Sequence, residues 1–347
     1  MSDRPLHLGI VGVGRIGATH ARTLAGLETV ERLTVTDLDP AAAARTVDAI
    51  AGVGAGRVTA AAVDAVPALL DSGIDALVIT TGTATHAGLI EAGVAAGLPT
   101  FCEKPVAGTV GESIALAELE RRSGVPIHIG FQRRFDAGYR RLREAVAAGE
   151  LGELRLVRAA THDQSPPPAA YLPGSGGIFR DCGIHDVDIL RFVTGREVVR
   201  AYAAGGTKGP AFFADAGDVD TGAAVLTLDD GTLALVSLTR YHGAGHDVRM
   251  EVHGSLGTLS AGLDDSLAIA SAQPGVAFPP GPTHPSFAER FAAAYAAELA
   301  AFVEVAAGRA PSPCTVADGL AAARIAEACA LSLAQGRPVE LSEVPAR

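Results

Sequence analysis

The stretch Gly12-Val13-Gly14-Arg15-Ile16-Gly17 decides the fold that this sequence predicts. It directly follows an apolar, strand-like run at residues 6–13 and opens a helical stretch. An acidic residue, Asp37, ends the next strand-like run at about the 20-residue spacing of dinucleotide-binding folds. In such folds the glycines admit a pyrophosphate close to the backbone, helix N–H groups receive its charge, and the carboxylate accepts hydrogen bonds from ribose hydroxyls.

This motif also indicates which dinucleotide is bound. The expected cofactor-binding residues of the motif are Gly12, Gly14, Arg15, Ile16, Gly17 and Asp37. A carboxylate at Asp37 would repel the 2′-phosphate of NADP, so the sequence favours NAD and makes NADP the less favoured cofactor. Two alternatives stay open: a strand–helix turn that binds no ligand, and a ribose contact made by Asp39 in place of Asp37.

Strand-like and helical segments alternate through the first third of the chain. The strand-like runs lie at residues 6–13, 31–37, 75–81, 99–103 and 126–131. Alternation at these lengths predicts an α/β fold, with an N-terminal Rossmann domain at residues 1–124 built on a doubly wound parallel sheet.

The pattern changes after about residue 150, where strand-like runs follow one another at 151–161, 197–205, 220–228, 232–240 and 247–254. Asp229-Asp230-Gly231 joins two of them in a hairpin signal. We predict a C-terminal α+β domain at residues 125–347 with a large, mostly antiparallel open sheet. Helices are expected at about 181–193, 286–307 and 315–334, and the last is a candidate to pack back on the first domain.

Composition excludes several classes of protein. Hydrophobic residues make up 48% of the 347 residues and charged residues 19%, which indicates a globular chain. The net charge of −11 disfavours a nucleic-acid partner, and no apolar run reaches the length of a membrane-spanning helix, so no membrane partner is expected. Four scattered cysteines without a CxxC pair are typical of reduced thiols, and we interpret the chain as cytoplasmic.

Lysine is almost absent from the chain. Of its 28 basic residues only Lys104 and Lys208 are lysine, and Lys104 lies in the stretch Phe101-Cys102-Glu103-Lys104-Pro105. A compact ammonium suits a position beside a reacting oxygen, where the planar guanidinium of arginine does not. The alternative is a residual lysine in a biased composition, and Lys208, in a glycine-rich loop, fits that reading.

A second polar stretch runs from Ser175 to Asp188. If it is helical, Asp181, His185 and Asp188 share one stripe, and a carboxylate beside an imidazole is a common general acid–base pair. An ordinary solvated helix face is the alternative. No further ligand set at suitable spacing accompanies it, so we predict no metal site here.

Taken together, these stretches resemble the glucose–fructose oxidoreductase/inositol dehydrogenase (Gfo/Idh/MocA) family, and most closely its inositol 2-dehydrogenase branch. The resemblance rests on residues 12–17 with His20, on Asp37, on Glu103-Lys104-Pro105, on residues 130–136, on residues 176–188 and on residues 251–257. It implies a catalytic triad of Lys104, Asp181 and His185. It also implies cofactor contacts from Thr81, His86, Glu103 and Lys104, candidate substrate contacts from Arg133, Asp163 and His185, and a homo-oligomer, either dimer or tetramer. Arg133 could equally be a structural ion-pair partner.

The activity implied is NAD-dependent hydride transfer from a secondary alcohol of a cyclic polyol or sugar. Substrate identity stays open because the loops at 80–86, 161–165 and 241–247 depart from common versions in the family. A biosynthetic keto-sugar reductase, an NAD-using glycoside hydrolase and a non-catalytic ligand sensor are the alternatives.

Overall fold

The computed structural model describes residues 4–53, 58–276, 278 and 281–344. By contacts between Cα atoms, these residues form two compact units. The first contains the described residues up to Phe131 together with Tyr295–Leu320, and the second contains Gln132–Ala294 and the described residues from Ala321 onward. The sequence-based boundary after residue 124 lies earlier than this division, because the last strand of the first sheet follows it.

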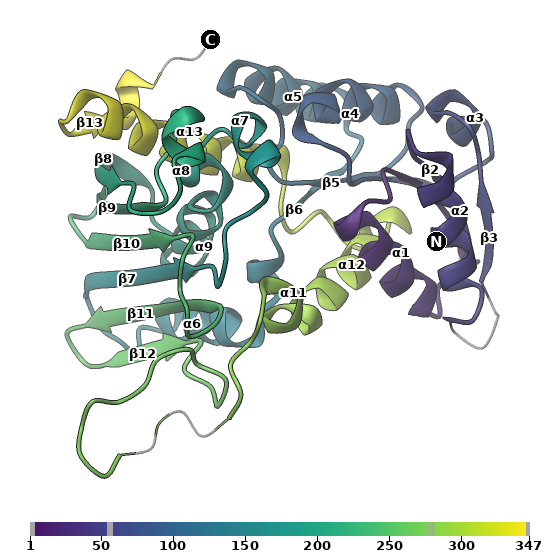
Figure 1. Cartoon of the computed structure of the whole chain (residues 1–347). Helices are drawn as coiled ribbons and strands as arrows, with labels where there is room; N and C mark the ends of the chain where they lie inside the picture. Colours follow the sequence, from purple (N-terminus) through teal and green to yellow (C-terminus); the bar gives the residue numbers. More distant parts are fainter. Residues whose placement is uncertain (1–3, 54–57, 277, 279–280, 345–347) are drawn as a thin grey trace. The chain divides into compact units, whose positions relative to one another are not determined.

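The first unit contains a six-stranded parallel sheet with the order β3-β2-β1-β4-β5-β6 (Figure 1). Its strands are β1 (Leu6–Val11), β2 (Val30–Thr36), β3 (Thr59–Ala62), β4 (Ala76–Ile79), β5 (Thr100–Glu103) and β6 (Ile127–Gly130). Its helices are α1 (Arg15–Gly26), α2 (Pro40–Ile50), α3 (Val66–Leu70), α4 (His86–Ala95) and α5 (Val110–Ser123). This order is that of a Rossmann fold, and the predicted doubly wound parallel sheet is confirmed.

The core of the first unit explains why distant parts of the sequence belong to it. Strand β1 is buried along its whole length, and Leu8 and Ile10 lie in one apolar cluster with Leu299 and Phe302. These last two residues come from α12 (Ala292–Ala306), far along the chain from the sheet that they cover. Local signals also fix where two helices begin: Asp39 caps α2, and Thr109 with Glu112 forms a capping box on α5.

The second unit contains a seven-stranded sheet with the order β12-β11-β7-β10-β9-β8-β13 (Figure 1). Its strands are β7 (Leu154–His162), β8 (Val198–Gly206), β9 (Thr221–Leu228), β10 (Leu233–Thr239), β11 (Asp247–Gly254), β12 (Thr258–Ala261) and β13 (Val339–Glu340). Strands β7 and β10 pair in parallel, and the other pairs are antiparallel. The predicted mostly antiparallel sheet is confirmed, including the hairpin between β9 and β10.

The helix expected from about Asp181 to Val193 corresponds to α9 (Ile184–Thr194), which begins three residues later than expected, and Asp181 ends a separate short helix, α8 (Ile178–Asp181). The other α-helices of the described residues are α6 (Ala137–Ala147), α7 (Leu172–Ser175), α8 (Ile178–Asp181), α9 (Ile184–Thr194), α10 (Phe212–Asp215), α11 (Phe287–Arg290) and α13 (Val316–Gln335). Cys182 and Gly183 separate α8 from α9, and a Cβ on Gly183 would lie 2.9 Å from the Leu238 side chain and 3.1 Å from the Phe179 carbonyl oxygen. The stripe of Asp181, His185 and Asp188 therefore does not lie on one continuous helix.

Two buried ion pairs attach α9 to the turn after β6. Arg133 donates to Asp186 at 2.9 Å, and Arg134 donates to Asp188 through two bonds of 2.9 and 2.6 Å. All four side chains are nearly inaccessible to solvent.

Within the described residues, none of the helices combines the length and apolarity that crossing a bilayer requires.

Candidate functional site

The glycine-rich turn after β1 is built for close backbone packing on one side and open space on the other. Gly12 has φ of 85°, and a Cβ there would lie 2.8 Å from the Thr81 side chain. A Cβ on Gly17 would lie only 2.1 Å from the carbonyl oxygen of Gly12, so α1 packs directly against the turn. Gly14 differs, because a Cβ there would meet nothing within 4 Å. The turn therefore leaves the backbone at Gly14 accessible to a ligand.

The N-terminus of α1 adds donors to this open space. Gly14 is the N-cap and supplies no capping side chain, and the first intrahelical bond runs from the Ala18 N–H to the Gly14 carbonyl. The N–H groups of the first helical turn are therefore available to an anion, with the positive end of the helix dipole behind them. A pyrophosphate fits this arrangement.

Asp37 lies beside the same turn, directly after β2. Its carboxylate accepts from the backbone N–H of Val13 at 2.6 Å and from that of Asp39 at 2.9 Å. These bonds fix the carboxylate against the glycine-rich turn and leave it remaining acceptor capacity for ribose hydroxyls. The next residue, Leu38, is a fully exposed hydrophobic side chain.

The loops after β4 and β5 are joined by His86. This buried side chain places Nδ1 2.7 Å from the carbonyl oxygen of Pro105 and Nε2 3.1 Å from that of Thr81. The Lys104-Pro105 peptide bond is cis. His86 therefore connects two loops that both leave the carboxyl edge of the sheet.

Glu103 and Lys104 lie where β5 ends. Glu103 is held by His20, a buried residue of α1, with 2.7 Å between His20 Nε2 and Glu103 Oε1. Asp37, Thr81, Glu103 and Lys104 thus all lie at the carboxyl ends of strands β2, β4 and β5. In an open α/β sheet this edge is where ligands bind, next to the point at which the strand order reverses.

In the second unit, Arg240 links two of the predicted site residues. Its guanidinium donates to Asp163 at 3.0 Å through Nη1 and to Asp181 at 2.6 Å through Nη2. Tyr171 donates its hydroxyl to the other oxygen of Asp181 at 2.8 Å, and His246 lies 3.4 Å from Asp163. One arginine thereby orients both carboxylates.

Electrostatics agree with this geometry. Burial acts to raise the pKa of Asp163, but hydrogen bonding to His246 and the charge of Arg240 outweigh it, and the pKa is lowered. Burial acts to lower the pKa of Arg240, but its anionic neighbours, including Asp181 and Asp163, raise it. The cluster is therefore a stable arrangement of charged groups at neutral pH.

The structure places the remaining predicted residues as follows. His185 lies half-buried in the first turn of α9, directly after the break that follows Asp181. Arg133 is buried, donates to Asp186 and to Thr161 at 2.8 Å, and lies over the Phe291 ring. This buried, ion-paired position fits the alternative in which Arg133 is a structural ion-pair partner and does not contact substrate.

Sequence reasoning missed Arg240, Tyr171 and His246. Arg240 follows the last residue of β10, which is a usual place for a site residue, but arginine is common in this chain and carries no signal of its own. Leu38 was also missed, although an apolar residue directly after the acidic end of β2 is a detectable signal.

Family models match most of the chain. Residues 6–131 match the model described as an oxidoreductase family with an NAD-binding Rossmann fold, and residues 139–260 match the GFO/IDH/MocA C-terminal domain.

Characterised relatives match over nearly the whole length. The myo-inositol dehydrogenase Hyg17 of Streptomyces leeuwenhoekii is 41% identical over 88% of this chain and 90% of its own length. The inositol 2-dehydrogenase of Rhizobium meliloti is 37% identical over 97% of this chain and 99% of its own. The crystal structure of scyllo-inositol dehydrogenase from Lactobacillus casei with bound NAD(H) and scyllo-inositol superposes with a TM-score of 0.83. It is 28% identical in sequence and covers 98% of this chain and 100% of that one.

Proposed function

The chain belongs to the Gfo/Idh/MocA oxidoreductase family, and on that premise we propose that it is an NAD-dependent dehydrogenase of inositol-like cyclic polyols. The observation that carries the proposal is the carboxyl edge of the first sheet, where the open Gly14 turn follows β1, Asp37 follows β2 and Glu103-Lys104 lies at the end of β5. The similarity to inositol dehydrogenases over almost the full length supports the substrate class.

The residues that would hold NAD fit its parts. The first turn of α1 presents N–H groups to the pyrophosphate, and Asp37 accepts from the adenosine ribose. We assign to Leu38 the role of an apolar cover for the adenine ring, because it is fully exposed beside Asp37. Thr81 and Glu103 contribute to the nicotinamide side, and His86 positions their loops. When bound, NAD supplies the ring that accepts a hydride.

The proton of the reacting hydroxyl goes to His185, which acts as the general base. Asp181 favours the imidazolium form of His185 through its negative charge. Lys104 donates to the substrate oxygen and stabilises the negative charge that develops there. These three roles are carried over from the family resemblance, and the chemistry of each side chain suits its role.

Arg240 is a positioning residue in this scheme. Its two bonds hold Asp181, the proposed partner of His185, and Asp163, the candidate substrate contact, in fixed directions. We assign Arg133 a structural role, because its guanidinium is buried and bonded to Asp186 and Thr161.

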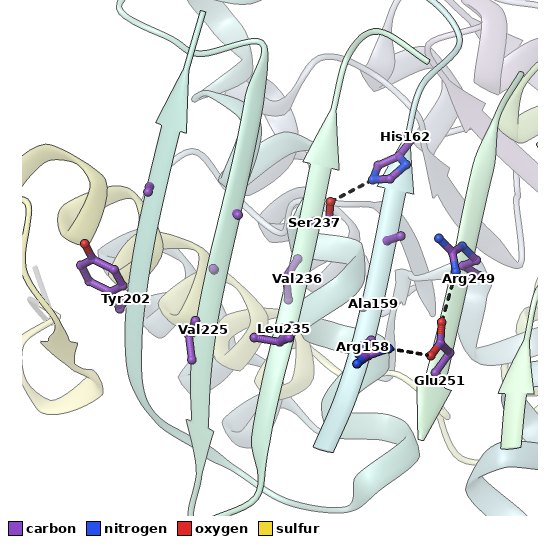
Figure 2. A pocket seen from close by; sticks show the side chains of 14 residues that line it. Arg158, Ala159, His162, Tyr202, Val225, Leu235, Val236, Ser237, Arg249 and Glu251 are labelled. Atoms are coloured by element: carbon purple, nitrogen blue, oxygen red, sulfur yellow. Dashed lines mark hydrogen bonds and ion pairs between the residues drawn. The ribbon is translucent and has the colours of Figure 1, made fainter. Parts of the chain in front are cut away.

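We also propose that the enzyme is a homo-oligomer that associates through the open face of the second sheet and works in the cytoplasm. That face carries exposed apolar side chains, among them Tyr202, Val225 and Leu235, around a shallow cavity of about 520 Å³ (Figure 2). Apolar patches on an otherwise charged surface are typical of interaction sites. The four buried thiols suit a reducing compartment.

An absorbance assay for NADH tests the proposal, with NAD or NADP and a panel of inositols, aldoses and lactones. We expect turnover with NAD and at least one inositol, and its loss in both Lys104→Ala and His185→Ala while NAD affinity is retained. Wild-type turnover in His185→Ala would overturn the general-base role. If the protein binds NAD but forms no NADH with any compound of the panel, the proposed substrate class would be overturned.

A further inference from the structure

Three potential metal ligands converge at one end of the second sheet. Within the described residues, His162, His242 and Asp247 form a group whose ligand atoms all lie within 4.8 Å of one another. They come from the end of β7, the loop between β10 and β11, and the start of β11. In the sheet register His162 lies directly opposite Asp247, so the two side chains share one face.

The local geometry suits a tetrahedral ion. His162 Nδ1 and Asp247 Oδ2 are 3.5 Å apart, close to the separation of about 3.4 Å between two ligands of tetrahedral zinc with bonds of 2.0–2.1 Å. The rings of His162 and His242 are 5.4 Å apart between centroids. Both histidines are partly accessible, which leaves a fourth position for water.

The partners of each ligand match those found around protein-bound metals. His242 Nδ1 lies 2.9 Å from the carbonyl oxygen of Gly245, which can only accept, so the proton sits on Nδ1 and the lone pair on Nε2. His162 Nε2 lies 3.0 Å from the Ser237 hydroxyl, which can accept its proton and leave the Nδ1 lone pair toward Asp247 (Figure 2). Arg249 donates to Asp247 at 3.2 Å. Such outer hydrogen bonds orient ligands in metal sites.

We propose that His162, His242 and Asp247 form a binding site for one divalent transition-metal ion of the zinc class. Two imidazoles and one carboxylate suit zinc and its neighbours, and are unsuited to calcium or magnesium, which prefer oxygen ligands. The ion would tie the 241–246 loop to β7 and β11. Because His162 precedes Asp163, and the His242 N–H donates to the Asp163 carbonyl at 2.8 Å, the ion would also stiffen the backbone around Asp163.

The test uses the untagged, metal-stripped full-length protein in equilibrium dialysis against zinc, followed by metal analysis. We expect one zinc per chain in the wild type. His242→Ala and His162→Gln should each lower zinc affinity by more than about tenfold, because losing even a hydrogen-bond partner of a metal ligand costs at least about that much. His253→Ala is the matched control, because His253 lies on β11 outside the group, beside Glu251 and Thr258. It should bind zinc like the wild type.

Cobalt provides a second readout that does not depend on stability. Cobalt(II) in the wild-type protein should give the intense visible absorption of a four-coordinate site, and this absorption should vanish in His242→Ala. Circular dichroism of each variant verifies folding. Absence of stoichiometric zinc, or equal binding by the wild type and both ligand variants, would overturn the proposal and leave His162 and Asp247 as an ion pair only.

Discussion

Arg240 donates a 2.6 Å hydrogen bond from Nη2 to the Oδ2 atom of Asp181, and both side chains are about nine-tenths buried. The second half of the guanidinium binds Asp163. A planar fork can serve two carboxylates at once, whereas an ammonium cannot match both directions. The relationship makes Arg240 the centre of the polar cluster in the second unit, although nothing in its sequence context singled it out.

Two replacements of Arg240 distinguish the effect of its positive charge from the effect of its forked geometry. Arg240→Lys keeps the cation and is expected to lower kcat with little change in NAD affinity. Arg240→Met removes the cation and leaves Asp181 with the Tyr171 hydroxyl and Asp163 with His246 as their partners, and breaking an ion pair with a buried partner in this way costs roughly 3–5 kcal/mol of stability. The loss of positive charge raises the pKa of Asp163, so the stability contributed by this carboxylate should be lost at higher pH in Arg240→Met than in Arg240→Lys when urea unfolding is followed across pH. Identical pH dependence of unfolding in the two variants would show that the charge of Arg240 does not act on Asp163.

Asp37 should decide between the two nicotinamide cofactors. Asp37→Ser removes the charge that repels a 2′-phosphate, so the preference for NAD over NADP should fall by at least about tenfold in kcat/KM, the equivalent of 1.4 kcal/mol. Steady-state kinetics with both cofactors measures this ratio. Asp39→Ser is the control, because Asp39 caps α2 and should leave the ratio unchanged. If the ratio of kcat/KM for NAD over NADP changes only in Asp39→Ser, the ribose contact would have to be assigned to Asp39.

Gly14 offers a test of cofactor approach that is independent of catalysis. A methyl group there meets no protein atom within 4 Å, so Gly14→Ala should fold normally. Because the added methyl occupies the space assigned to the pyrophosphate, NAD binding measured by calorimetry should weaken several-fold or more. Gly88→Ala in α4 is the matched control, since a Cβ there also meets nothing. Equal NAD affinity in both variants would contradict the placement of the pyrophosphate.

Asp163 should contribute stability that disappears in acid. Its pKa is lowered in the folded protein, so the ionised carboxylate stabilises the fold above its unfolded pKa, and that contribution is lost as pH falls through the folded value. The difference in unfolding free energy between wild type and Asp163→Asn should therefore be constant at higher pH and shrink below about pH 3.9, the reference value for aspartate. Urea unfolding across pH measures it. A difference that stays constant in acid would show that the ion pairs of Asp163 do not stabilise the fold.

The sheets were predictable because their signals are local. The buried run of β1 and the glycine turn before α1 each act within a few residues, and the structure forms them where the sequence predicts. Strands β3, β12 and β13 were missed, because β3 reads Thr-Ala-Ala-Ala and is largely exposed, and β12 and β13 span only four and two residues. β3 lacks the apolar alternation that marks a strand, and β12 alternates polar and apolar residues over too few positions to be recognised.

The candidate site was predictable only in part, for a different reason. Periodicity placed Asp181 and His185 on one helix, whereas the structure has two helices joined at Cys182-Gly183, where the backbone of Gly183 packs closely against the distant Leu238 side chain. The same holds for Arg240 and for the group of His162, His242 and Asp247, which the pairing of β7 with β11 assembles. Tertiary contacts of this kind leave no trace in local spacing.

The most direct test of the central claim follows the hydrogen atom itself. The protein is incubated with NAD and an inositol deuterated at its ring carbons, and the reduced cofactor is analysed by mass spectrometry. The proposed hydride transfer predicts one deuterium on the nicotinamide ring of each NADH formed. Failure to form NADH with any inositol, or NADH without the label, would contradict dehydrogenation of the polyol by this protein.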